Sequence, residues 1–239
     1  MPLRLLCACL LLAGCATIAP GPDAAGVDVL LIGEQHDADA HPGLQQRWVE
    51  QLARGGTLAA LAVEMAERGA STTGLPTHAS EDQVRQALRW TDDSGWPWER
   101  YGPAVMAAVR AGVPVTGANL PRGQMRQAMN DKSLDLLLPG PALKAQQQAI
   151  RSGHCELLPE HQVGPMTRVQ IARDVAMAST VASLVRQGGT VVLIAGSGHV
   201  QPDLGVPRHL PKELNVKPVL LERQETGKDY CAELRRQRP

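Results

Sequence analysis

Apolar residues along the chain concentrate in five short runs. Segments whose apolar residues repeat at helical spacing lie between most of these runs. The runs lie at Val27 to Gly33, Thr57 to Met65, Val113 to Asn119, Thr190 to Ala195 and Val216 to Glu222. Short continuous apolar runs are typical of strands buried on both faces, as in a parallel sheet covered by helices. Between them, Pro42 to Arg54 and Val169 to Arg186 repeat apolar positions at helical spacing, whereas Val206 to Leu210 is expected to be a loop. The pattern predicts an α/β fold with a mainly parallel sheet covered by helices and a smaller helical subdomain.

The length and composition predict one domain. A chain of 239 residues with 44% hydrophobic content can bury one sizeable core, and a second full domain would be cramped. We expect the α/β domain at 27–224, with helical insertions at about 66–112 and 122–187, and a C-terminal tail at 225–239. The 24 basic and 24 acidic residues balance, so charge gives no reason to propose a nucleic acid as partner.

The N-terminus has the pattern of an export signal. Arg4 precedes the apolar run Leu5 to Leu12, which is too short to span a bilayer. Leu12 to Cys15 resembles a bacterial lipoprotein cleavage site, which implies a signal peptide at 1–14, acyl chains such as palmitate on Cys15 and a tether at 15–26. Ala16 after the cysteine implies the periplasmic side of the outer membrane by the same resemblance. An ordinary secretory signal cleaved nearby is the alternative.

Cys155 and Cys231 are the cysteines that remain beyond Cys15. In an oxidising periplasm they could form a disulfide. The alternative is two free thiols, one of them a thiolate ligand. No CxxC or CxxCH spacing supports a zinc knuckle or covalently attached haem.

Polar side chains that can take part in binding or catalysis stand at the ends of four apolar runs. They are Glu34 and His36, then Glu64, then Asn119 and Arg122, and finally His199. Carboxyl ends of parallel strands share one edge of a sheet, which is where α/β folds bind ligands, so we expect these side chains to meet. Such a set could ligate a metal, transfer protons or bind a carboxylate or phosphate through Arg122. It could also be a satisfied structural network of buried polar groups.

The aromatic residues are unusual in number and place. The chain has no Phe, and Trp90, Trp96, Trp98 and Tyr101 lie close together in sequence. They could pack a helical lid onto the sheet. They could also form a wall for a flat apolar ligand, with the Tyr101 hydroxyl as its polar group.

Six segments in the right order resemble the ChaN family of haem-binding uptake lipoproteins, within the wider Tiki and erythromycin-esterase-like superfamily. They are GEQHD at 33–37, VEM at 63–65, WERYGP at 98–103, ANLPR at 118–122, GHCELLPE at 153–160 and GSGHV at 196–200. The resemblance implies a lipid-anchored protein that holds haem non-covalently near the sheet edge, and it allows a homodimer with haem between two protomers.

Two functions follow as hypotheses. The first is haem binding for iron acquisition. Its expected ligand set is Tyr101 as the axial iron ligand, since tyrosine is an established haem ligand, with His36, His199, Arg122, Asn119, Glu34, Glu64 and Trp98 around the haem. The second is a Tiki-like metal-dependent peptidase or esterase, in which Glu34, His36, Glu64 and His199 hold or serve a divalent metal ion.

Overall fold

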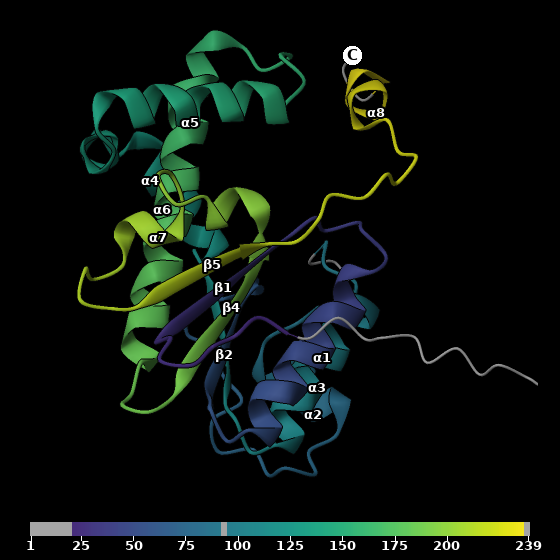
Figure 1. Cartoon of the computed structure of the whole chain (residues 1–239). Helices are drawn as coiled ribbons and strands as arrows, with labels where there is room; N and C mark the ends of the chain where they lie inside the picture. The colour runs from purple at the N-terminus through teal and green to yellow at the C-terminus, as the bar shows by residue number, and fades with distance from the viewer. Residues whose placement is uncertain (1–20, 92–94, 237–239) are drawn as a thin grey trace, which may run out of the picture.

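A five-stranded parallel sheet forms the centre of the protein (Figure 1). The computed structural model describes residues 21–91 and 95–236, so the predicted signal peptide and Cys15 lie outside the described residues. The strand order is β3-β2-β4-β1-β5. The bounds are β1 Val29–Glu34, β2 Leu58–Glu67, β3 Val115–Asn119, β4 Thr190–Gly196 and β5 Val216–Leu220. The predicted α/β class is confirmed. In the described residues the one antiparallel pairing is an isolated bridge between Ser71 and Thr116.

Helices cover both faces of the sheet because alternate strand residues point to opposite sides. In β1, Leu30 and Ile32 pack into the core shared with α1 (His41–Arg54), α2 (Glu81–Ala87) and α3 (Trp98–Arg110). Val29 and Leu31 pack instead into the core formed with α6 (Glu160–Leu184) and α7 (Val206–His209). Figure 1 shows α1 to α3 on one side of the sheet and α6 with α7 on the other.

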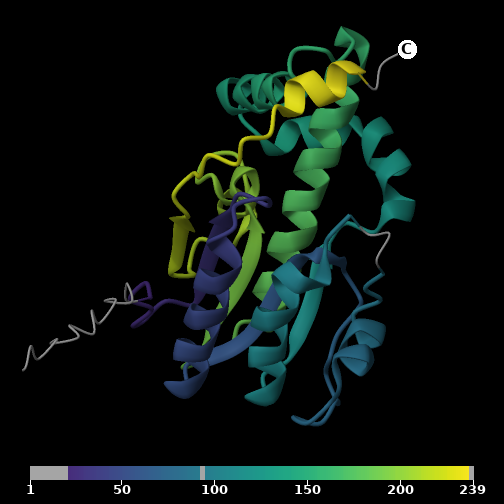
Figure 2. The same cartoon turned by 90° about the vertical axis from the view of Figure 1, so that its right-hand side faces the viewer.

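A smaller helical region extends beyond the carboxyl ends of the strands, as both cartoons show (Figures 1 and 2). It contains the 3₁₀ helices η2 (Arg122–Gln124) and η3 (Lys132–Leu137), α4 (Met125–Asn130), α5 (Gly140–Gly153) and the N-terminal half of α6. Its own small core joins Leu120, Ala128 and Val169. Arg168 on α6 also binds the Asp135 carboxylate with Nε at 3.0 Å and Nη2 at 2.9 Å. This region therefore lies directly beside the sheet edge where the candidate site was predicted.

Two boundaries differ from the sequence predictions. The long helix was predicted to begin at Val169, after Pro165, but α6 begins at Glu160. Pro165 lies in the second turn of α6, where it has no N–H to donate to the His161 carbonyl, and the helix continues through it. Val206 to Leu210, predicted as a loop, contains the short helix α7, with Pro207 near its start.

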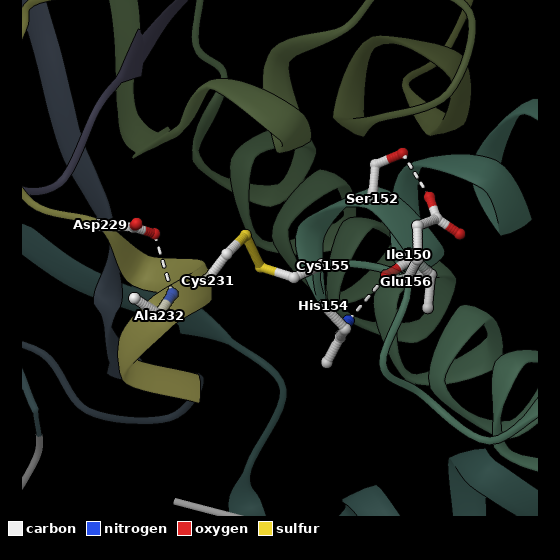
Figure 3. The surroundings of a disulfide bond; sticks show 8 residues. All are labelled: Ile150, Ser152, His154, Cys155, Glu156, Asp229, Cys231 and Ala232. Carbon is white, nitrogen blue, oxygen red and sulfur yellow. Dashed lines mark hydrogen bonds between the residues drawn. A yellow bond between two sulfur atoms is a disulfide. The ribbon is translucent and has the colours of Figure 1, made fainter. Parts of the chain in front are cut away.

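A disulfide between Cys155 and Cys231 fastens the C-terminal segment to the helical region (Figure 3). It joins the turn after α5 to α8 (Tyr230–Arg236), across a sequence separation of 76. Before α8, the segment after β5 crosses the end of β1, where the Gln224 N–H donates to the Gln35 side chain at 3.1 Å. The C-terminal tail thus lies beside the sheet edge.

No helix in the described part of the chain is long and apolar enough to cross a membrane.

Candidate functional site

The carboxyl ends of the strands bring the polar side chains to one edge of the sheet. Glu34 ends β1, Asn119 ends β3, and β4 ends at Gly196, directly before the 3₁₀ helix η4 (Ser197–Val200) that carries His199. Glu64 lies within β2, where the pairing with β3 shifts register between Val63 and Glu67. Such irregularities redirect side chains, and here Glu64 reaches the end of β4.

The Glu34 carboxylate is buried and accepts hydrogen bonds from three side chains. The His36 Nδ1–H donates to Oε1 at 2.8 Å, and the Tyr101 hydroxyl donates to the same oxygen at 2.8 Å. Gln45 of α1 donates to Oε2. These contacts fix the orientation of the His36 ring, because its Nδ1 must carry the proton that a carboxylate accepts. Its Nε2 then points away from Glu34.

Glu64 and His199 form a second, fully buried pair. One Glu64 oxygen accepts the Gly196 N–H at 2.7 Å, and the other lies 3.3 Å from His199 Nε2. On the opposite side of the ring, His199 Nδ1 donates to Asp174 of α6 at 2.5 Å. Both ring nitrogens of His199 therefore face carboxylates.

Gly196 lies between the two pairs and allows their close approach. A Cβ atom at this position would lie 2.6 Å from His36 Nε2 and 3.5 Å from Glu64 Oε2. The observed separation of His36 Nε2 and Glu64 Oε2 is 3.9 Å. The glycine after the fourth strand thus makes room for the His36 ring.

The pKa values of the buried pair follow from burial and charge. Burial alone would lower the pKa of His199, but Glu64 and Asp174 outweigh it and raise the pKa to about 10. Burial opposes the ionised form of Glu64, but the charges of His199 and His36 lower its pKa to about 2. Burial raises the pKa of Asp174 to about 6. At neutral pH, His199 is a protonated imidazolium between carboxylates.

His36 is more exposed and its pKa is also raised. Burial lowers the pKa of this imidazole, and the hydrogen bond to Glu34 and the charge of Glu64 outweigh that effect. The ring contacts Trp96 edge-on, with ring centroids 4.6 Å apart.

A cavity of about 310 Å³ opens beside these groups at the ends of β2 and β3. Glu64, Asn119 and Arg122 line it, as do Trp96, Arg89 and Arg173. His36 does not itself line the cavity, but it contacts Trp96, and its Nε2 lies 3.9 Å from Glu64, and both of these residues line it. Three of the predicted site residues therefore lie at one cavity.

Five of the predicted haem contacts do not line this cavity, and two of them, Tyr101 and Trp98, belong to the hydrophobic core. Tyr101 is almost fully buried, and burial and the Glu34 carboxylate raise the pKa of its hydroxyl far above the ordinary value. A phenolate ligand needs that proton to leave, so the geometry argues against Tyr101 as an axial ligand. Trp98 is also buried, and its Nε1–H donates to Glu81 at 3.0 Å. It packs between α2 and α3 and does not line the cavity.

Sequence reasoning missed Asp174 and Gln45, which hold the two pairs in place. Both have a recognisable signal, because helical spacing predicts that they point inward. Gln45 shares a face with Trp48 and Leu52 of α1. Asp174 lies among the buried positions of α6. A polar residue at an inward helix position needs a partner, and that partner is the site.

The described residues contain no group of three or more His, Cys, Asp or Glu side chains placed to hold a metal ion. The second hypothesis therefore gains no ready-made metal centre from this part of the chain.

The model of a protein family described as haem-binding uptake, Tiki superfamily, ChaN matches residues 22–210. This chain belongs to that family. The match covers most of the chain and includes every strand end described above except that of β5. No curated protein matches the sequence.

Solved structures support the fold of this ChaN-family protein. A structure described as cofacial heme binding to ChaN of Campylobacter jejuni matches with a TM-score of 0.68 and 22% identity, covering 84% of this chain and 83% of that one. A structure of the type III effector HopBA1 matches with a TM-score of 0.40 and 17% identity, over 72% of this chain and 67% of that one. The first likeness confirms the α/β fold.

Proposed function

We propose that this ChaN-family protein binds haem non-covalently at the carboxyl edge of its sheet and serves haem or iron acquisition. One observation carries the proposal: His36, paired with Glu34 at 2.8 Å, contacts Trp96, which lines a cavity together with three arginines. Membership of a family described as haem-binding uptake supports it. The absence of a CxxCH sequence is the reason for proposing a non-covalent mode.

His36 is the proposed axial ligand of the haem iron. A metal-ligating histidine commonly donates its other ring N–H to a carboxylate, which fixes the ring and makes the ligating nitrogen more basic. Glu34 is placed to do this, since it accepts the His36 Nδ1–H. His199 is a poor candidate because both of its ring nitrogens face carboxylates.

Tyr230 is the competing candidate, and one observation favours it. It is about half exposed, unlike Tyr101, and its hydroxyl donates to Asp37, one residue after His36. The family's haem could thus meet either side chain at the same edge of the sheet, and substitution separates the two.

A homodimer is part of the proposal. The cavity of about 310 Å³ is at the small end of the range for small-molecule pockets, roughly 300–1,000 Å³. A flat macrocycle would therefore leave a face uncovered by one chain. The Campylobacter jejuni protein is described by cofacial heme binding, and we propose that a second copy covers the haem here too.

Membrane attachment through acyl chains on Cys15 completes the proposal. The apolar run after Arg4 and the small residues before Cys15 support it. The protein would then be held on the periplasmic side of the outer membrane.

Titration with haemin tests the function. We expect a Soret band that saturates and a shift of the protein to dimer size by light scattering. In this test Tyr230→Phe keeps the spectrum if His36 ligates the iron and changes it if Tyr230 does. A spectrum of free haemin at all protein concentrations would reject haem binding.

The metal-dependent hydrolase is the second candidate. The strongly shifted pKa values of Glu64 and His199 favour it, because perturbed groups cluster at catalytic sites. We rank it second, since the described residues present no grouped metal ligands. Elemental analysis together with peptide and ester hydrolysis assays tests it; a stoichiometric divalent ion and turnover lost in Glu64→Gln would place it first.

A further inference from the structure

The lining of the cavity beside Glu64 carries more positive charge than binding the apolar part of a macrocycle requires. Three arginines line it, namely Arg89, Arg122 and Arg173. Two glutamates face them, and both are already engaged. Glu64 is held by Gly196 and His199, and Glu67 Oε1 accepts the Arg122 backbone N–H at 2.9 Å. Among the described residues, arginines therefore outnumber glutamates in the cavity lining.

One of these donors is buried without a partner. The Nε–H of Arg173 is inaccessible to solvent and has no hydrogen-bond partner among the described residues. Buried polar groups in proteins are nearly always paired, so this orphan on a residue of the cavity wall indicates a partner that the described residues do not provide. An acceptor in the cavity would provide one once the guanidinium turns toward it.

The backbone of Arg89 supports the same conclusion independently. Helix α2 ends in a Schellman motif, in which the Trp90 N–H donates to the Arg85 carbonyl and the Arg89 N–H to the Gln86 carbonyl. Arg89 occupies the left-handed position of this motif, with φ of 52°, where glycine is normally preferred. An arginine here costs conformational energy, and its guanidinium at the cavity is the compensating feature.

The other walls of the cavity are apolar. Met65, Leu120 and Trp96 contribute to its lining. A ligand that fits must therefore have an apolar body and an anionic end. Carboxylates match the planar fork of arginine through paired hydrogen bonds.

We propose that this cavity is a carboxylate subsite, in which Arg89 and Arg173 bind a propionate of the haem. The inference rests on the proposed haem binding and assigns the part of the ligand that the arginines recognise. The iron end of the same ligand would extend toward His36, which contacts Trp96 of the cavity wall.

Haemin and haemin dimethyl ester, which lacks the free carboxylates, are the probes for this subsite. Each is titrated into the wild-type protein and into Arg89→Gly, and the Soret change gives the dissociation constant. We expect the wild type to bind the ester about tenfold or more weakly than haemin, as for a lost charged hydrogen bond. In Arg89→Gly, haemin binding falls by a similar factor and the preference over the ester shrinks.

The Arg89→Gly variant separates binding from folding. Because glycine suits the left-handed position, its melting temperature should equal or exceed that of the wild type. Arg173→Gln is the second variant, and Arg110→Ala is the matched control, since Arg110 is exposed at the last turn of α3 and lies outside this cavity. The control should bind haemin as the wild type does.

The outcomes distinguish the carboxylate subsite from the proposed haem binding on which it rests. If haemin and its ester bind the wild type equally, or if Arg89→Gly and Arg173→Gln both bind haemin normally, the carboxylate subsite is overturned and haem binding stands. If the wild type binds neither compound, the haem-binding proposal itself is overturned.

Discussion

Two histidines at the same sheet edge, each paired with a glutamate, have different environments. His36 lies 2.8 Å from Glu34 through Nδ1 and only 3.9 Å from Glu64 through Nε2, and its side chain is 37% exposed. His199 is 7% exposed and lies between two carboxylates, one at each ring nitrogen. Residue type and sequence position do not distinguish them, whereas burial and the number of partners do.

The difference separates a binding role from a structural one. His199, with its pKa raised to about 10 by Glu64 and Asp174, is held as a cation that joins β2, α6 and the end of β4. His36 keeps one nitrogen directed away from Glu34, and its ring contacts Trp96, which lines the cavity. We therefore expect changes at His199 to act on folding and changes at His36 to act on ligand binding.

The largest expected effect is that of His199→Ala on stability. The substitution leaves Glu64 and Asp174 as buried carboxylates without their cation, which costs about 3–5 kcal/mol. Urea unfolding measures it. The matched variant His36→Ala removes one of three donors to the buried Glu34 carboxylate and should cost less, about 1.5–3 kcal/mol. Equal losses in the two variants would erase the distinction between the histidines.

The pH dependence of stability is the second expected effect. In the folded state the pKa of His199 is raised to about 10, above its unfolded value of 6.5. Its contribution is thus complete below about pH 6.5 and is lost as the pH rises toward 10. The free energy of unfolding should fall by at most about 1.4 kcal/mol per pH unit in this window. Urea titrations at several pH values measure the slope, which His199→Gln should remove; an unchanged slope would contradict the assignment.

Tyr101→Phe is expected to act on the fold through Glu34. Loss of its hydrogen bond to the carboxylate, 2.8 Å long, should cost about 1.5–3 kcal/mol in thermal or urea unfolding. Haemin binding should persist, because the hydroxyl is buried and does not line the cavity. Tyr230→Phe, at an exposed hydroxyl, serves as the control with the smaller stability change. A folded Tyr101→Phe protein that has lost its Soret band would restore Tyr101 as ligand.

Gly196→Ala should have the smallest effect on stability. The added Cβ meets the end of the His36 ring at 2.6 Å, and a half-exposed side chain can move aside, so the cost should stay below about 1 kcal/mol. Displacing His36 should nevertheless weaken haemin binding severalfold. Gly198→Ala is the matched control, since its Cβ would meet nothing within 4 Å. Identical haemin affinities in the two variants would show that the position of His36 is unimportant.

The sequence was sufficient to predict the α/β class and which strand ends meet. Unbroken apolar runs identify parallel strands, and parallel strands place Glu34, Glu64 and Asn119 at a common edge. The direction of the aromatic side chains was less predictable. Trp98 and Tyr101, three residues apart on α3, both point inward, and only the packing against α1 and α2 shows that they are core.

Helical spacing indicates that Asp174 and Gln45 point inward, but it does not show which residues they pair with. Asp174 is 25 residues from His199, and Gln45 is 11 residues from Glu34, so tertiary packing alone brings each pair together. Arg89 reaches the cavity from the turn after α2 and Arg173 from α6, and their sequence patterns indicated only helices.

Haemin titration of His36→Ala, followed by addition of imidazole, tests the central claim most directly. If His36 ligates the iron at the edge of the sheet, the variant folds normally, its Soret band shifts and weakens, and imidazole restores the wild-type spectrum. A His36→Ala spectrum and affinity identical to those of the wild type would contradict the account.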